Sequence, residues 1–563
     1  MNDEIRALVL QNALEHNGKA DPAPVLGKVM AFHPDMRKDP AGAKRIVTEL
    51  VLEINGMTID EQKVLLEKLG GPKEIRKRER RDPLFPLRIV EGKETRMRFA
   101  PGPSGPLHIG HTRAAILNDE YCKRYDGTFI LRLEDTNPER IDPEAYTMIP
   151  EDLQWMNVSV DETYIQSDRF EIYYDIAREL LEKGYAYVCT MDVEEWRDLK
   201  LKGKPSPERD QTPEEQLDRW DGMLQGAYDE GEAFMVIKTD LKHKNPAVRD
   251  FVGMRIRHAP HPRTGERYHL YPLYNLSVAI DDHLMECTHI LRGKDHLNNT
   301  VRQKFVFEHM GWELPEYIHY GLVSIPDTIL KTSLIREDIM SGQYSGWDDV
   351  RLGTVRALAE RGFNPDSIRR YWLEVGVKPV DIRFSWETLE TMNREIIDRS
   401  ANRYFFVDSP VPLTIDSPNP LEGRAPCHPE EPERGYRYYR LVPTDGSIRV
   451  YLTQKDVNSL EQGELIRLKD ICNVRIKDIE GPRAEFVGID LEDLKNAKGR
   501  ILHWVPEKSL PCKVLMRDGS IVTGLVEEGA ETAAERGDVV QFERFGYCKL
   551  RMEDMVVGRF THK

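Results

Sequence analysis

Two histidines stand three residues apart, directly after a turn rich in glycine and proline, in the stretch FAPGPSGPLHIGHTRAAILN (99–118). The following residues are typical of a helix, so the spacing of His108 and His111 places both rings on one side of its first turn. A helix start exposes unpaired N–H groups and the positive end of the helix dipole, and both attract phosphate. Two imidazoles there can donate hydrogen bonds to a phosphate whose charge grows in a transition state.

Three glycines around the histidines favour the same interpretation. Gly102 and Gly105 let the backbone approach a ligand closely, and Gly110 leaves room above the first helical turn. A turn with two capping histidines and no ligand is the alternative, and it would be preferred for an isolated His-x-Gly-His. The preceding strand and the Pro-Ser-Gly turn favour a nucleotide site. The sequence has no Walker A loop, which disfavours an ordinary P-loop kinase or ATPase.

The segments around this motif predict the elements that position it. RMRFA (96–100) and GTFILRL (127–133) are strand-like and enclose a helical segment, so they predict a βαβ unit in a parallel sheet. Apolar, strand-like segments occur again at YPLYNLSVAIDD (271–282) and HILRG (289–293), and they predict that the sheet resumes there. The alternating pattern near the C-terminus, broken by Asp-Gly turns, predicts β-barrels.

We therefore expect a multidomain protein built on an α/β Rossmann-type core. The predicted order is a helical domain (1–85), the first half of the core (86–190), an inserted lobe (191–270), the second half of the core (271–345), a helical connector (346–405) and β-barrel domains (406–563). In the first of these, Thr58 and Glu61 have the spacing of a capping box, before a stripe of Leu65, Leu66 and Leu69.

Composition excludes several classes of protein. The net charge of −16 argues against a general nucleic-acid coat, although a local basic stripe would suffice for a specific site. The seven cysteines are scattered with no C-x-x-C, so we expect reduced thiols in a cytoplasmic protein, with no disulfide framework and no structural zinc. No apolar window is long enough to span a bilayer, and the acidic start does not fit a secretory signal.

The basic run KEIRKRERR (73–81) is interpreted as a solvated linker, with an RNA-facing edge as the alternative.

RFAPGPSGPLHIGHTRAAILN (98–118) resembles the first signature of class I aminoacyl-tRNA synthetases, and within them the glutamyl/glutaminyl group. The resemblance continues through 129–140, 271–300 and 346–363. It is strongest to the glutamyl enzymes of the archaeal and eukaryotic type, whose anticodon domain is a β-barrel. It implies ATP-dependent joining of glutamate to tRNA(Glu) through a glutamyl-adenylate, with tRNA(Gln) as a further candidate substrate. It also implies Mg²⁺ bound with the ATP, and protein or tRNA partners for the N-terminal helices.

The resemblance assigns an amino-acid pocket to four residues. Arg98 would pair with a substrate carboxylate, Glu134 would hold the α-ammonium, Arg292 would read the side-chain carboxylate and Tyr274 would line the pocket. A buried arginine there favours glutamate, because a neutral amide would leave its charge unpaired. Taken singly, the arginines could be surface ion-pair residues and the tyrosine a core residue. Asp281, Asp282 and Asp295 lie in the same motifs and are interpreted as scaffold.

The loop of this chain that corresponds to the second family signature, Lys-Met-Ser-Lys-Ser, departs from that pattern. Its loop falls on ILKTSLIRED (329–338), and its second lysine falls on Thr332. Either Lys331 reaches the phosphates from one residue away, or Arg336 substitutes, or the hydroxyls of Thr332 and Ser333 contribute. We prefer Lys331. The altered loop also keeps open a tRNA-binding protein without catalysis, beside a glutaminyl-tRNA synthetase and a small-molecule nucleotidyltransferase.

Overall fold

The computed structural model describes residues 2–33, 35–36, 39–69, 71, 82, 84–89 and 92–563. The chain divides into two compact units, Met1–Asp82 and Pro83–Lys563. The basic run at 73–81 lies outside the described residues. No helix in the described part of the chain combines the length and apolar character needed to cross a bilayer.

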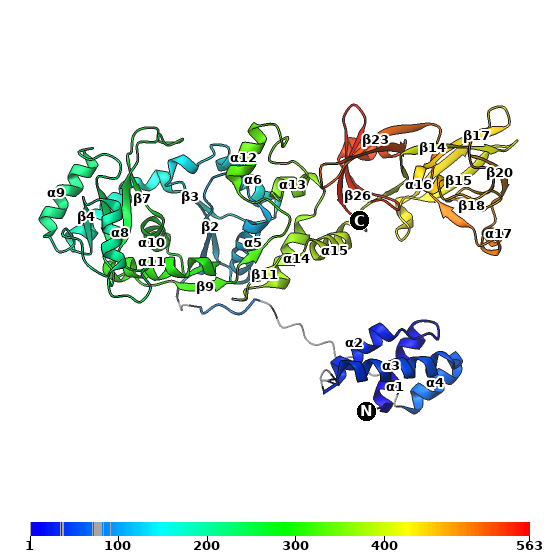
Figure 1. Ribbon diagram of the computed structural model, residues 1–563, viewed down its shortest axis with the longest axis horizontal. Helices are drawn as coiled ribbons and strands as arrows, with labels where there is room; N and C mark the ends of the chain where they lie inside the picture. The colour runs from blue at the N-terminus through cyan, green and yellow to red at the C-terminus, as the bar shows by residue number, and fades with distance from the viewer. Residues whose placement is uncertain are drawn as a thin grey trace. The chain divides into compact units, whose positions relative to one another are not determined.

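The first unit contains four helices, α1 (Asn2–Glu15), α2 (Pro22–Phe32), α3 (Pro40–Asn55) and α4 (Ile59–Lys68) (Figure 1). The predicted capping box begins α4: the Thr58 hydroxyl accepts the Glu61 N–H, and the Glu61 carboxylate accepts the Thr58 N–H. Leu66 of the predicted stripe is buried in the core that the four helices share, and Leu65 and Leu69 pack against it. Local capping and one apolar stripe thus explain this helix.

The second unit is organised around a five-stranded parallel sheet in the order β3-β2-β1-β8-β9. Its strands are β1 (Arg96–Phe99), β2 (Thr128–Leu133), β3 (Glu162–Ile165), β8 (His289–Gly293) and β9 (Glu316–Tyr320). The predicted βαβ unit is present as β1, α5 (Ile109–Arg124) and β2. Chain order reverses direction between β1 and β8, and the carboxyl ends of strands at such a switch point are where α/β sheets bind ligands.

An antiparallel sheet interrupts the parallel one. It has the order β4-β5-β6-β7, with strands β4 (Ala186–Cys189), β5 (Phe234–Ile237), β6 (Phe251–Ile256) and β7 (Leu270–Pro272). Helices α8 (Val193–Leu201) and α9 (Pro213–Leu224) lie between its first two strands in the chain. Helices α6 (Ala145–Trp155) and α7 (Phe170–Glu182) come before it in the chain.

The expectation that 271–282 is strand-like was wrong for most of its length. Only its first residues belong to β7, and α10 (Tyr274–Leu284) begins two residues later. All residues from Asn275 to Asp282 are buried, the polar ones included, so over this span the helix has no exposed polar face that would give its sequence a clear helical period. A short apolar run of this kind cannot be distinguished from a buried strand by periodicity alone. The second segment, 289–293, is the strand β8 as predicted.

Helix α11 (Leu297–Met310) connects β8 to β9, and α12 (Thr332–Met340) follows β9 in the chain. The segment 346–405, predicted to be helical, contains α13 (Val355–Glu360), α14 (Pro365–Val375) and α15 (Trp386–Ile397). A short parallel pair joins β10 (Val323–Ser324) to β11 (Ile382–Arg383). Arg113 of α5 connects these parts by donating to the carbonyls of Gly321 and Gly376.

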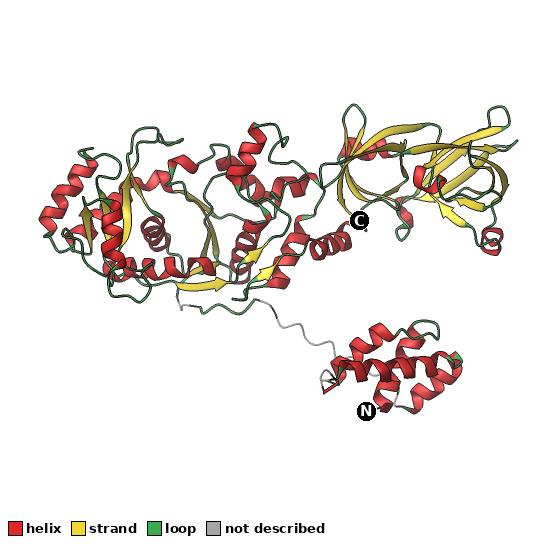
Figure 2. Cartoon of the chain, in the orientation of Figure 1, coloured by secondary structure: helices red, strands yellow, loops and turns green. Residues whose placement is uncertain are grey.

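Two seven-stranded sheets form the C-terminal part (Figure 2). One contains β12 (Arg403–Tyr404), β13 (Phe406–Asp408), β23 (Ser509–Leu515), β24 (Ile521–Glu527), β25 (Val539–Phe542), β26 (Gly546–Met552) and β27 (Val556–His562). The other contains β14 (Pro410–Asp416), β17 (Ser447–Thr453), β18 (Leu465–Leu468), β19 (Cys472–Asp478), β20 (Arg483–Gly488), β21 (Arg500–Leu502) and β22 (Val505–Pro506). In each, the two end strands of the order are neighbours in the chain, β12 with β13 and β21 with β22. Each sheet therefore curls round toward a barrel, and the chain leaves the first sheet to build the second before it returns. A separate hairpin pairs β15 (Leu421–Pro426) with β16 (Tyr436–Leu441).

Candidate active site

The His-x-Gly-His motif forms the first turn of α5. His108 is the N-cap of this helix, and its Nδ1 accepts the N–H of Gly110 at 3.1 Å. The Nδ1 of His111 accepts the N–H of His108 at 3.5 Å. The two rings stack with centroids 3.6 Å apart and planes 20° from parallel, as the spacing predicted. With each Nδ1 accepting a backbone proton, the ring proton resides on Nε2, so each ring presents a donor.

Burial keeps both imidazoles neutral near pH 7. It lowers the pKa of His111 to about 4. Burial also lowers the pKa of His108 well below its ordinary value, and the neighbouring His111 lowers it further. The pair therefore contributes two neutral N–H donors beside the positive end of α5 rather than a fixed positive charge.

The glycines of the motif differ in what requires them. Gly105 has φ +153°, and a Cβ there would lie 3.1 Å from the Trp347 ring and 3.3 Å from Thr332 Cγ2. A Cβ on Gly110 would lie 3.0 Å from the ring of His108. At Gly102 the nearest atom is the Glu134 carbonyl oxygen at 3.5 Å, so space alone does not demand glycine at that position.

The loop at 329–338 packs against this turn. Lys331 is the N-cap of α12, and the hydroxyl of Thr332 lies 3.0 Å from the hydroxyl of Ser104. Arg336 donates to the Ser104 carbonyl at 2.7 Å and pairs with Asp142 at 3.0 Å. Lys331 and Ser333 are exposed. Of the two cations considered for the phosphates, Arg336 is thus engaged within the fold, whereas the side chain of Lys331 is in solvent.

Arg98 and Glu134 meet at the carboxyl ends of β1 and β2, held by a buried ion-pair network. Arg98 Nε and Nη2 donate to the two carboxylate oxygens of Asp282 at 2.9 and 3.4 Å. Arg132 donates to the same Asp282 oxygen as Arg98 Nε, at 2.7 Å, and to Glu134 at 3.0 Å. Burial raises the pKa of Glu134 even though Arg132 and Arg98 oppose it. Asp282 therefore positions both arginines, in keeping with its interpretation as scaffold.

Arg292 and Tyr274 occupy the adjoining end of β8 and the start of α10. Arg292 donates to the hydroxyls of Thr300 at 2.8 Å and Tyr274 at 3.5 Å, and to the amide oxygen of Gln303 at 2.7 Å. Burial, with a contribution from Glu134, raises the pKa of Tyr274 to about 12, so its hydroxyl stays neutral. The influence of Glu134, Arg98 and Arg292 on this one hydroxyl shows that the four residues predicted for the amino-acid pocket share one neighbourhood.

Three further residues take part in this region and were not singled out as site residues. The sequence could have indicated Arg132, because a charged residue in the middle of an apolar strand is rarely buried without a partner. Gln303 and Thr300 left none: both lie in α11, among mixed polar and apolar residues that would suit any half-buried helix.

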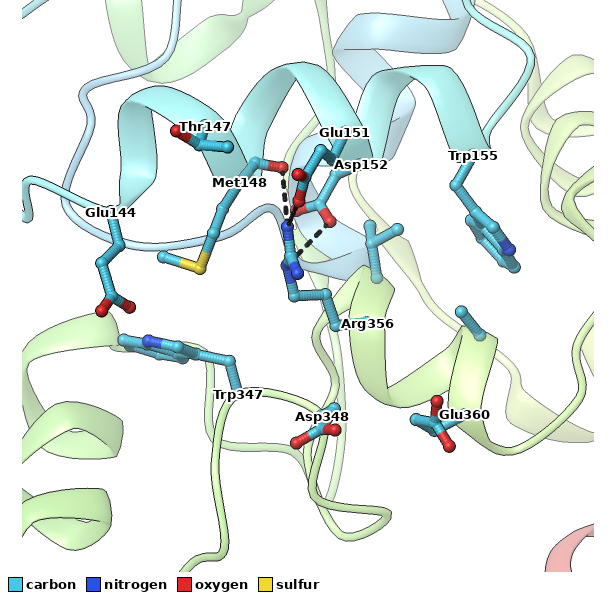
Figure 3. Close-up of a pocket in the computed structure, with 12 residues that line it drawn as sticks. Glu144, Thr147, Met148, Glu151, Asp152, Trp155, Trp347, Asp348, Arg356 and Glu360 are labelled. Carbon is cyan, nitrogen blue, oxygen red and sulfur yellow. Dashed lines mark hydrogen bonds and ion pairs between the residues drawn. The ribbon is translucent and has the colours of Figure 1, made fainter. Parts of the chain in front are cut away.

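A cavity of about 680 Å³ lies between α6 and α13 (Figure 3). It contains none of the residues predicted for the site. In it, Arg356 pairs with Glu151 at 2.5 Å and with Asp152 at 3.3 Å. The other carboxylate oxygen of Asp152 accepts the N–H of Leu107 at 2.7 Å, so this cavity touches the backbone that leads into His108.

Comparison with known proteins agrees with this geometry. The family model described as "tRNA synthetases class I (E and Q), catalytic domain" matches residues 94–399. Two models described as anti-codon binding domains of the same synthetases match residues 401–492 and 501–551.

Three similar proteins are each named "Glutamate--tRNA ligase". That of Methanopyrus kandleri is 46% identical over 98% of this chain and 96% of its own length. That of Thermoplasma volcanium is 46% identical over 100% and 99%, and that of Methanocaldococcus jannaschii is 44% identical over 98% of both chains. With a catalytic-domain match over more than half its length, this chain belongs to the class I glutamyl/glutaminyl tRNA synthetase family.

Proposed function

We propose that the protein is a glutamate–tRNA ligase that uses ATP to join L-glutamate to the 3′ end of tRNA(Glu). The observation that carries the choice of amino acid is the buried Arg292, whose partners within the fold are hydroxyl and amide groups. A glutamate carboxylate satisfies such a guanidinium, whereas the amide of glutamine leaves its charge uncompensated. The names of the similar proteins support the same choice.

In the first step, the glutamate α-carboxylate attacks the α-phosphorus of ATP, the bond to the β-phosphate oxygen breaks, and glutamyl-adenylate and pyrophosphate form. His108 and His111 donate through Nε2 to the phosphates as charge develops, and the turn of Gly102, Gly105 and Gly110 brings the backbone close to the nucleotide. Lys331 neutralises the departing pyrophosphate, with Thr332 and Ser333 beside it. Mg²⁺ would neutralise further phosphate charge when it enters with ATP.

Arg98, Glu134, Tyr274 and Arg292 hold the amino acid. Arg98 Nη1, the guanidinium nitrogen that does not bond Asp282, serves a substrate carboxylate, and Glu134 receives the α-ammonium. In the second step, a hydroxyl of the terminal tRNA adenosine attacks the activated carbonyl and AMP leaves. Because the protein forms no bond to either substrate, positioning and charge neutralisation supply the catalysis.

The remaining parts are assigned to tRNA. We place the acceptor end on the lobe of β4–β7, α8 and α9, and the anticodon on the two C-terminal sheets, since sequence-specific RNA recognition uses unstacked loops. The helical unit before residue 82 is assigned to partner proteins or to tRNA. We include tRNA(Gln) as a second acceptor, and we propose that the enzyme acts in the cytoplasm.

Charging with labelled glutamate tests the proposal, with purified tRNA(Glu) and tRNA(Gln) side by side. We expect glutamyl-tRNA with tRNA(Glu). Preferential use of glutamine would establish a glutaminyl-tRNA synthetase instead. Binding of tRNA without tRNA-dependent ATP–pyrophosphate exchange would instead support a tRNA-binding protein that has lost catalysis.

A further inference from the structure

Arg292 is a buried cation held by uncharged partners. The residue is 5% exposed, and its Nη2 donates to Thr300 Oγ1 at 2.8 Å and Gln303 Oε1 at 2.7 Å. Nη1 is 3.5 Å from the Tyr274 hydroxyl, and the guanidinium carbon lies 5.4 Å from the centre of the Tyr317 ring. Nε has no hydrogen-bond partner among the described residues. Nη2 is therefore anchored by two short hydrogen bonds, whereas Nη1 has one long contact and is left to a ligand.

The other two buried arginines of the site are arranged differently. Arg98 and Arg132 share the carboxylate of Asp282, and Arg132 also pairs with Glu134. Arg292 has no carboxylate within 4.0 Å in the part of the chain that the structure describes. Two of the three positive charges are thus matched inside the protein, and the third is left to be matched by what binds.

The two histidines near Arg292 carry no charge near pH 7. His319 Nε2 lies 2.9 Å from the Thr300 hydroxyl, and burial, reinforced by Arg292, lowers the pKa of His319 to about 4. Burial lowers the pKa of His296, whose Nδ1 is 3.1 Å from the Tyr274 hydroxyl. Both rings are neutral near pH 7, so neither adds a charge beside the uncharged hydrogen-bond partners of Arg292.

Gln303 is the partner that leaves the positive charge of Arg292 unneutralised, because its side chain is an amide. It is fully buried on α11, and its amide nitrogen faces Asn275 Oδ1 at 3.5 Å, which directs its oxygen at Arg292. Glutamate has nearly the same shape as glutamine, so a carboxylate at this position would keep the contact and add the counter-charge that the shell lacks.

We propose that Gln303, together with Thr300, is a positioning residue that sets amino-acid specificity. Its neutral amide fixes the orientation of Arg292 without neutralising it, so the positive charge is available only to the side-chain carboxylate of the bound amino acid. The inference rests on the proposed function, because it assumes that Arg292 faces an acidic amino acid.

The test is Gln303→Glu in the full chain, with Asn298→Asp as the matched control. Asn298 lies on the same helix and accepts a hydrogen bond from Asn245, outside the Arg292 shell. For Gln303→Glu we expect the KM for glutamate to rise roughly 100-fold, with a smaller change in kcat, and the preference for glutamate over glutamine to fall by a similar factor. Asn298→Asp should leave the glutamate KM unchanged.

Two further measurements keep the inference testable if Gln303→Glu folds poorly. Gln303→Met removes the anchor without adding charge, and we expect a rise in the glutamate KM of roughly tenfold at nearly constant kcat. Glutamate should also raise the Tm of the wild-type protein and of Asn298→Asp, and should lose this effect in Gln303→Glu.

Failure of the inference is distinguishable from failure of the proposed function. If the wild-type protein does not charge tRNA with glutamate, or Arg292→Ala leaves the glutamate KM unchanged, the proposed function or the pocket is wrong. If both hold but Gln303→Glu and Gln303→Met keep the wild-type KM and preference, Gln303 has no part in specificity.

Discussion

The carboxylate of Asp152 accepts the N–H of Leu107, the residue directly before His108, at 2.7 Å. The same segment is paired on its other side, where Val355 donates to the Leu107 carbonyl at 2.8 Å and Ile109 donates to the Gly353 carbonyl at 2.9 Å. The backbone on both sides of His108 is therefore held by Asp152 of α6, which Figure 3 shows, and by the segment that begins α13.

Asp152→Ala should slow ATP–pyrophosphate exchange roughly tenfold or more, because a reacting group displaced by a fraction of an ångström loses alignment. Asp152→Asn keeps an oxygen acceptor for Leu107 and should retain most of the activity. The measurement is kcat of exchange for both variants at saturating substrates. Equal activity of Asp152→Ala and wild type would show that the backbone contact has no role in positioning His108.

Acidification should destabilise the protein through the half-buried His111. Its pKa is about 4 in the fold against an ordinary 6.5, so the unfolded chain takes up the proton first. The stability that it contributes is complete above about pH 6.5 and is lost as pH falls toward 4. The free energy of unfolding lost in this way by pH 5 is about 2 kcal/mol. His111→Asn should therefore lose less stability than wild type between pH 7.5 and pH 5 in urea denaturation. His258→Asn, at a half-exposed ring, is the control, and identical losses in all three proteins would contradict a half-buried neutral His111.

Lys331→Ala should slow adenylate formation while tRNA affinity stays unchanged. The exposed ammonium of Lys331 is free to reach the pyrophosphate, whereas Arg336 is engaged by Ser104 and Asp142. Single-turnover adenylate formation and tRNA binding measure the two effects separately, with Lys93→Ala as a control at another exposed lysine. Equal loss of both would rule out a role confined to the phosphates.

Asp282→Asn should be strongly destabilising and should weaken glutamate use. It removes the counter-charge of two buried arginines, Arg98 and Arg132, and breaking a buried pair costs roughly 3 kcal/mol or more. Urea denaturation and the glutamate KM give the two readouts, and Asp295→Asn, at an exposed carboxylate of the same sequence motif, is the control. A variant as stable as wild type would mean that the arginines find other partners.

The sequence predicted those features that depend on local rules. The helix start at His108, the capping box of Thr58 and the βαβ unit all follow from residues within a few positions of one another. The helix α10 was missed because burial on all sides erases its period. Arg98 pairs with Asp282, which is 184 residues away, and Gln303 anchors Arg292. Both contacts depend on which helix covers which strand end, and this cannot be predicted from residue spacing.

The central claim is that Arg292 meets the side-chain carboxylate of glutamate while His108 and His111 meet the phosphate of the nucleotide. A crystal structure with a non-hydrolysable glutamyl-adenylate analogue tests both contacts at once. We expect the carboxylate within hydrogen-bond reach of Arg292 Nη1 and the phosphate within hydrogen-bond reach of the two Nε2 atoms. An analogue bound with its carboxylate turned away from Arg292, or with its phosphate away from the histidine pair, would contradict it.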